Sequence, residues 1–147
     1  MIPPSQLIDQ LKRQEGLRLA AYRDTLGNWT IGYGHTPASE GETLTESQAN
    51  NLLIIDLYNA QSDLKTSLPW SESALSVCRY CALWNMTFNM GIAHLLEFRL
   101  MLAAVRNKDW NEASRQMLDS LWARQVKDRA IELADQMKTG SWFNPET

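Results

Sequence analysis

The sequence contains few cysteines, and their spacing excludes several kinds of protein. Cys78 and Cys81 are the only two, three positions apart in a hydrophobic stretch. They do not form the cysteine framework of a small disulfide-stabilised domain. No second cysteine pair completes a zinc site. We therefore expect two buried small hydrophobic residues, and we expect no metal and no cofactor.

Long apolar runs and an excess of positive charge are also missing. No segment approaches the roughly 18 apolar residues that a membrane-spanning helix needs. The N-terminus lacks the charged start and apolar core of a signal peptide. The net charge is -3 at pH 7, which does not favour binding to nucleic acid. We expect synthesis in the cytoplasm, no membrane span and no nucleic-acid partner.

What the sequence does contain is the pattern of one ordinary globular domain, beginning with a helix. The chain has 147 residues, and 44% of them are hydrophobic, enough for a normal core. Leu7, Ile8 and Leu11 share one helix face, and Gly16 marks the end of this helix. Glu15 continues the apolar stripe. A carboxylate on an inward face needs an explanation, because burying it without a partner is costly.

A turn and an extended segment follow the first helix. Residues 24–27 have turn chemistry, and residues 28–35 are predicted to be a strand whose side chains alternate between two faces. One face is bulky and suited to packing, with Trp29, Ile31 and Tyr33. The other is nearly bare, with Asn28, Thr30, Gly32 and Gly34. Glycines within a strand often mark close approach by a ligand or another backbone, so we interpret the bare face as a cleft wall that carries the Thr30 hydroxyl.

The remaining two thirds of the chain are predicted to be helical. Thr45-Glu46-Ser47-Gln48 is a capping-box pattern that opens a long helix ending near Pro69. Residues 73–90 are apolar nearly all round, as in a central buried helix. Shorter helices are expected at 95–107, 110–119 and 126–137.

These elements predict an α+β, mainly helical fold in a single domain over residues 1–147. A small N-terminal lobe with a β-hairpin covers about residues 12–56. A connecting helix at 46–68 joins it to a larger helical lobe, which comprises about 69–147 together with the first helix. Clefts between lobes are favoured ligand sites.

Two carboxyl groups and one hydroxyl suggest glycoside hydrolysis. That reaction commonly uses one carboxylic acid to protonate the leaving oxygen and a second carboxylate to activate water or to attack. Glu15 has the partly apolar setting that keeps an acid protonated near neutral pH. Asp24, in a polar turn, should remain ionised, and the Thr30 hydroxyl could hold the attacking water by a hydrogen bond.

Three segments resemble the phage-type lysozymes, glycoside hydrolase family twenty-four. They are residues 15–19, 22–25 and 27–35. The family's catalytic triad is Glu, eight residues, Asp, five residues, Thr, and here residues 16–23 and 25–29 fill the two gaps. Further similarity extends the resemblance over essentially the whole chain, at residues 81–86, 88–91, 110–113, 120–122 and 139–142.

The resemblance implies that the α+β fold is lysozyme-like. It also implies a muramidase that cuts the β-1,4 bond between N-acetylmuramic acid and N-acetylglucosamine in bacterial peptidoglycan. Glu15 would be the general acid, and Asp24 and Thr30 would position the water. An inverting enzyme of this kind holds its carboxyl groups roughly 6.5–9.5 Å apart, so that a water molecule fits between them.

The same resemblance implies residues that support the triad or bind sugar. Arg129 matches a family arginine that pairs with the acid. His35 matches a histidine that pairs with an acidic residue of the connecting helix, here Asp56, in a structural role. Expected substrate contacts are Thr36, Phe88 and Gln116; Met101 departs from the family's polar residue at its position, and Trp122 is the tryptophan expected at the cleft rim.

In biological terms the resemblance implies an endolysin, a monomeric bacteriolytic enzyme of a bacteriophage. It would be made in the host cytoplasm and reach the periplasm and cell wall through a membrane-permeabilising holin. Two alternatives remain open. A lytic transglycosylase uses a single Glu, against which Asp24 and Thr30 argue. A non-catalytic glycan-binding or virion module is disfavoured because the triad is intact.

Overall fold

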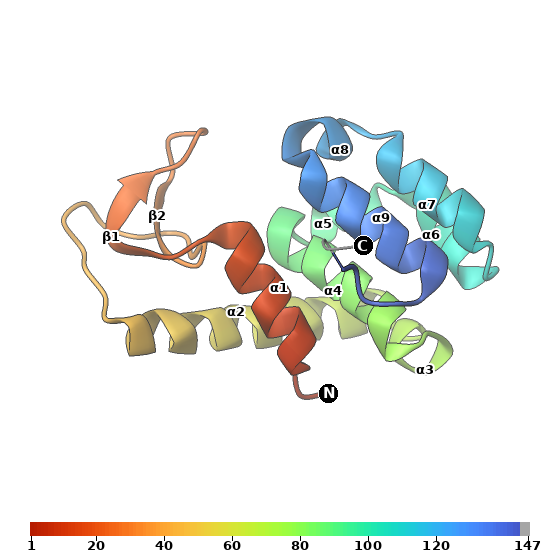
Figure 1. Cartoon of the computed structure of the whole chain (residues 1–147), viewed down its shortest axis with the longest axis horizontal. Helices are drawn as coiled ribbons and strands as arrows, with labels where there is room; N and C mark the ends of the chain where they lie inside the picture. Colours follow the sequence, from red (N-terminus) through yellow and green to blue (C-terminus); the bar gives the residue numbers. More distant parts are fainter. Residues whose placement is uncertain (145–147) are drawn as a thin grey trace. The chain divides into compact units, whose positions relative to one another are not determined.

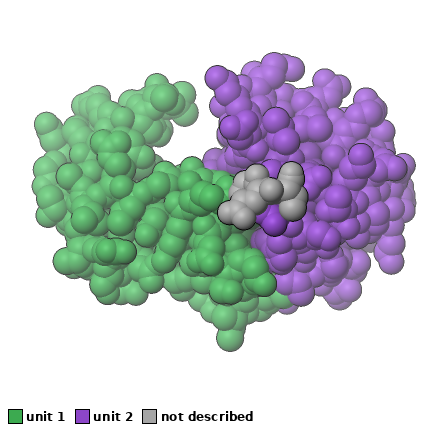
Figure 2. Space-filling view, viewed as in Figure 1, with its two compact units in different colours: residues 1–59 green, residues 60–147 purple. Residues whose placement is uncertain are grey.

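The computed structural model describes residues 1–144, and the chain divides into two compact units. The first comprises residues 1–59 and the second begins at residue 60 (Figure 2). The first unit contains helix α1 (Ser5–Glu15), strands β1 (Arg18–Arg23) and β2 (Trp29–Gly32), and the first part of helix α2 (Glu46–Ser67) (Figure 1). The second unit contains the rest of α2 and seven further helices among the described residues: α3 (Ser71–Ala74), α4 (Val77–Met90), α5 (Ile92–Leu96), α6 (Arg99–Arg106), α7 (Trp110–Leu118), α8 (Leu121–Val126) and α9 (Asp128–Thr139).

This element order confirms the predicted α+β, mainly helical, lysozyme-like fold. Helix α1 belongs to the first unit, and the lobe boundaries given above remain predictions. No helix within residues 1–144 is long and apolar enough to cross a membrane.

Helix α1 ends where the sequence predicts, and this places Glu15 on its last turn. Leu7 and Leu11 are completely buried, as their shared face requires. Gly16 adopts a φ of 71°, and its N–H still donates to the carbonyl of Lys12. Because this backbone conformation favours glycine, the chain leaves the helix directly after Glu15.

The β-hairpin is shorter than the sequence pattern indicates. Strands β1 and β2 pair antiparallel, with Tyr22 opposite Thr30 and an irregularity between Arg18 and Tyr22. The prediction that the strand continues to His35 is wrong. Ile31 and His35 exchange two backbone hydrogen bonds of 2.9 and 2.8 Å, which close a tight loop after Gly32. On the strand face that is predicted to be bulky, Ile31 and Tyr33 are buried, as expected.

The segment before α2 covers the free edge of β1 and then caps the helix. The N–H of Ala21 donates to the Glu42 carbonyl at 2.9 Å, and that of Leu44 donates to the Leu19 carbonyl at 2.8 Å. The predicted capping box is confirmed. The N–H of Gln48 donates to the Thr45 hydroxyl at 3.1 Å, and the N–H of Thr45 donates to the Gln48 amide oxygen at 2.9 Å.

The second unit is organised around α4, as the apolar character of this segment predicts. Trp84 is fully buried, and α9 packs against both α4 and α7. Cys78 and Cys81 are free, buried thiols on α4, and burial raises the pKa of Cys81 to about 12. They are hydrophobic core residues, as expected. The predicted boundaries differ at three points. Helix α3 is separate from α4, the helix expected at 95–107 is divided between α5 and α6, and Lys127, with a φ of 53°, interrupts the last helical segment.

We expect Thr45→Ala to lower the free energy of unfolding by about 0.5–2 kcal/mol, because it removes the acceptor that caps α2. Urea unfolding followed by circular dichroism measures this. Ser47→Ala is the matched control: Ser47 is an exposed hydroxyl in the first turn of α2. Equal stability of the two variants would contradict a capping role for Thr45.

Candidate active site

The Glu15 carboxyl group lies against the α-carbon of Gly34. A β-carbon built on Gly34 would overlap Glu15 Oε2 and would lie 3.0 Å from Glu15 Cδ. The φ of Gly34 is +74°, a conformation that residues with side chains rarely adopt. The absence of a side chain at Gly34 is therefore what leaves room for the carboxyl group of Glu15.

Asp24 is held by the backbone of the turn that follows it. Its Oδ1 accepts hydrogen bonds from the N–H groups of Leu26, at 2.9 Å, and Asn28, at 2.8 Å. Its own N–H donates to the Asn28 carbonyl at 2.9 Å. Within residues 1–144, no hydrogen bond to Oδ2 is formed. The carboxylate is therefore fixed through one oxygen while the other can accept a proton or a hydrogen bond.

Thr30 shares a hydrogen-bond partner with Asp24. The Thr30 hydroxyl donates to the Asn28 carbonyl at 3.0 Å, so the peptide groups of Asn28 contact both residues. Thr30 is only 3% exposed, so the strand face that the sequence predicts to be nearly bare is covered at this residue. Its single O–H is used within the turn, which leaves its oxygen as an acceptor towards any water molecule that it meets.

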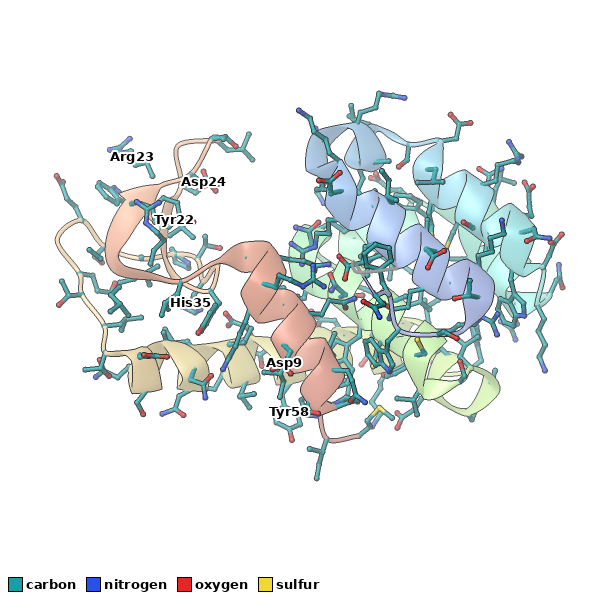
Figure 3. The ribbon with its side chains drawn as sticks, in the orientation of Figure 1. Asp9, Tyr22, Arg23, Asp24, His35 and Tyr58 are labelled. Atoms are coloured by element: carbon teal, nitrogen blue, oxygen red, sulfur yellow. The ribbon has the colours of Figure 1, made fainter. Side chains whose placement is uncertain are left out.

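The loop that carries Gly34 is attached to α2 by His35. Nδ1 of His35 lies 2.8 Å from Oδ2 of Asp56, and both side chains are about three-quarters buried. Together with the backbone hydrogen bonds between Ile31 and His35, this contact fixes the loop at both of its ends. Thr36 follows and is exposed. Figure 3 shows Asp24 and His35 in the same unit, with Tyr22 and Arg23 in the hairpin.

The other residues singled out from the sequence lie in the second unit. On α9, Arg129 donates from Nε and Nη2 to the amide oxygen of Asn85, at 3.1 and 2.9 Å. Phe88, on α4, is half-buried. On α7, Gln116 donates to Glu112 at 2.9 Å. Hydrogen bonds from Arg115 and Gln116 lower the pKa of Glu112 to about 2.

Two residues of the second unit are buried in its core. Trp122 is 8% exposed, donates to the Asn89 amide oxygen at 2.7 Å and packs edge-on against Phe98. The expectation that it lines a rim is therefore wrong. Met101 is 1% exposed. Among residues 1–144, no cluster of three or more potential metal ligands occurs.

Two residues that organise the site were not identified from the sequence. The glycine pattern indicated close approach to the strand, but the neighbour of Gly34 is the Glu15 side chain, and that of Gly32 is Ala49 of α2. Asn28 was assigned only to the bare face, whereas its backbone connects Asp24 with Thr30. The signal available for this second feature was Asp24 at the start of a predicted turn, since an aspartate there commonly accepts from the N–H two residues on, which is Leu26 here.

Comparison with known proteins identifies the family of this chain. A family model described as phage lysozyme matches residues 12–134, and the chain belongs to the phage lysozyme family. It is a glycoside hydrolase of the muramidase class, acting on peptidoglycan.

Three relatives illustrate the range of the family. The endolysin of Salmonella phage P22 is 31% identical over 92% of this chain and 93% of its own length. The probable T4-type lysozyme 1 of Dictyostelium discoideum is 28% identical over 93% of this chain and 96% of its own length. The pre-baseplate central spike protein Gp5 of Enterobacteria phage T4 is 31% identical over 95% of this chain, which spans only 28% of the spike protein.

We expect Gly34→Ala to reduce peptidoglycan hydrolysis by about 100-fold, because the new methyl group displaces the Glu15 carboxyl group and a misplacement of about 1 Å can cost this much. Turnover on purified cell walls measures the loss. Gly41→Ala is a matched control, since Gly41 has a φ of +82° and no atom near its missing β-carbon. Both variants carry the same kind of backbone strain, so equal loss in the two would argue against a steric role for Gly34.

Proposed function

We propose that the chain is an endolysin that hydrolyses the β-1,4 bond between N-acetylmuramic acid and N-acetylglucosamine with inversion, using Glu15, Asp24 and Thr30. The observation that supports this most strongly is the shared hydrogen bonding of Asp24 and Thr30 to the peptide groups of Asn28. It gives one fixed carboxyl group before the turn and one fixed hydroxyl acceptor on β2 after it. Glu15 lies at the end of the helix that leads into the same hairpin.

In the proposed reaction, a water molecule donates one hydrogen bond to Oδ2 of Asp24 and another to the Thr30 oxygen. The water oxygen attacks the anomeric carbon of the muramic acid residue while Asp24 accepts its proton. The glycosidic C–O bond breaks, and Glu15 transfers its proton to the departing oxygen. An inverting arrangement requires roughly 6.5–9.5 Å between the two carboxyl groups. The substrate-binding roles of Thr36, Phe88 and Gln116 and the supporting role of Arg129 belong to the same proposal.

We expect Glu15→Gln to lower turnover on the order of 10²–10⁴-fold, because an amide cannot protonate the leaving oxygen. Release of soluble fragments from purified peptidoglycan measures this, and a melting curve reports whether the fold is retained. Glu40→Gln, in an exposed loop of the same unit, is the matched control. Full turnover by a folded Glu15→Gln variant would exclude Glu15 as the acid.

The products of the wild-type digest separate hydrolysis from its alternatives. Hydrolysis leaves a reducing muramic acid end, whereas a lytic transglycosylase leaves an anhydro end whose mass is lower by one water. Proton NMR during the first turnovers gives the anomeric configuration, and inversion yields the α-anomer first. An anhydro product or a β-anomer would overturn the mechanism proposed here.

We expect Thr30→Val to lower turnover about tenfold or more, since it removes the oxygen that accepts from water and keeps the shape of the side chain. Loss of one hydrogen bond to a reacting group commonly costs this much. Thr30→Ser keeps the hydroxyl and should retain most activity. Thr30→Val also removes the hydrogen bond to Asn28, so melting curves of both variants accompany the kinetics. Similar activity of the Val and Ser variants would contradict the role of the hydroxyl.

For its biology, we propose a monomer made in the host cytoplasm that reaches the periplasm and cell wall through a holin and lyses the host. The match to nearly the whole P22 endolysin supports this. The match to a part of the T4 spike protein favours a second candidate. In that case the same hydrolytic unit would work as a virion component at the start of infection.

A further inference from the structure

Arg18 lies on the hairpin with its guanidinium group stacked on an aromatic ring. The group is 4.2 Å from the ring centroid of Tyr22, and Arg18 is exposed while Tyr22 is half-buried. Among residues 1–144, no ion pair or hydrogen bond to this guanidinium is formed. Stacking uses the flat face of the group and leaves the N–H donors at its edge free. The cation is therefore ordered and still able to bind an anion.

The strand register places this pair on the same face as Thr30. Tyr22 is opposite Thr30, and Arg18 is opposite Gly32. Directly opposed residues of an antiparallel pair point to the same side of the sheet. Asp24 follows Tyr22 by two positions and pairs with Asn28 through its backbone, so it continues the same face. Figure 3 labels Tyr22 and Asp24 at the turn end of the hairpin.

A second pair of the same kind occurs on the opposite face. The guanidinium of Arg23 lies 5.0 Å from the ring centroid of Trp29, its partner in the register. Arg23 is also exposed and has no ion pair among the described residues. Because neighbouring residues of a strand alternate in direction, Arg23 points away from the face that carries Thr30. A substrate at Asp24 and Thr30 would meet Arg18 and not Arg23.

Peptidoglycan differs from an uncharged β-1,4 glycan in the acidic substituent of its muramic acid. This substituent ends in a carboxylate, which belongs either to the stem peptide or, where the peptide has been removed, to the lactyl group. Arginine binds carboxylates through two parallel N–H···O hydrogen bonds, which add specificity as well as affinity. The chain as a whole does not supply a general attraction to anionic glycans, because its net charge is -3.

We propose that Arg18, ordered by Tyr22, binds the carboxylate of a muramic acid substituent and thereby determines which glycans are cut. The inference rests on the proposed function, since it requires the scissile bond to lie at Asp24 and Thr30. Arg18 is a specificity-determining residue in this account and takes no part in proton transfer.

The test compares Arg18→Gln with Arg23→Gln, two variants with the same change in charge on opposite faces of one hairpin. Three soluble substrates are used: peptidoglycan with intact stem peptides, glycan stripped of peptides by an amidase, and intact peptidoglycan whose carboxyl groups have been converted to amides. We expect Arg18→Gln to raise KM about threefold to tenfold on a carboxylate-bearing substrate, as for loss of a charge-assisted hydrogen bond near the surface. The value of kcat should stay within about twofold, and Arg23→Gln should leave both parameters close to wild type.

The substrates identify the source of the carboxylate. If Arg18→Gln raises KM on intact peptidoglycan alone, the bound carboxylate belongs to the stem peptide. If the rise in KM persists on the stripped glycan, the carboxylate belongs to the lactyl group. On the amidated substrate, Arg18→Gln and the wild-type chain should have the same KM. An unchanged KM for Arg18→Gln on all three substrates overturns the inference, as does an equal rise for Arg23→Gln. Failure of the wild-type chain to cut any substrate would instead reject the proposed function, so the two failures are distinguishable.

A measurement on the wild-type chain keeps the inference testable if Arg18→Gln does not fold. The Nε–H signals of arginine are followed by NMR while a free stem tripeptide is added, and then while its fully amidated form is added. We expect the Arg18 signal to shift with the acidic peptide and not with the amide, and the Arg23 signal to stay unchanged with both. No shift of Arg18, or matching shifts of the two arginines, would overturn binding of the stem carboxylate.

Discussion

The contact between the Glu15 carboxyl group and the α-carbon of Gly34 is the constraint on which the first unit's site depends. It brings the end of α1 to the loop that closes the hairpin. The same loop is attached to α2 through His35 and Asp56. The loop therefore connects the end of α1, the hairpin and α2. A different kind of contact makes each connection: steric fit at Glu15, backbone hydrogen bonds between Ile31 and His35, and a side-chain contact between His35 and Asp56.

The two carboxyl groups are positioned in different ways, and the difference suits the roles proposed for them. Glu15 ends a helix and packs against the backbone of Gly34, whereas Asp24 accepts two N–H groups within its own turn. Rigid placement of reacting groups reduces the reorganisation needed during the reaction. The local turn thus fixes the Asp24 carboxyl group through hydrogen bonds from within residues 24–28.

Much of this fold could be predicted from the sequence because it is encoded locally. The end of α1 at Gly16 and the capping box at Thr45 both follow from neighbouring residues. The length of β2 could not be predicted, because periodicity does not reveal that Ile31 and His35 bond to each other. For the same reason, the glycine pattern indicated a close neighbour of Gly34 without identifying Glu15. Glu15 belongs to α1, and only folding brings it next to Gly34.

Asn28 contributes to the site through its peptide groups, and its own side chain is exposed. Its amide nitrogen and carbonyl oxygen are present whichever ordinary amino acid occupies the position, proline excepted. An alanine scan would therefore overlook the residue whose backbone connects Asp24 with Thr30. Replacing the amide by an ester, which removes the N–H and leaves the side chain intact, would reveal it. In this enzyme a position can thus be important through its backbone and still tolerate a change of its side chain.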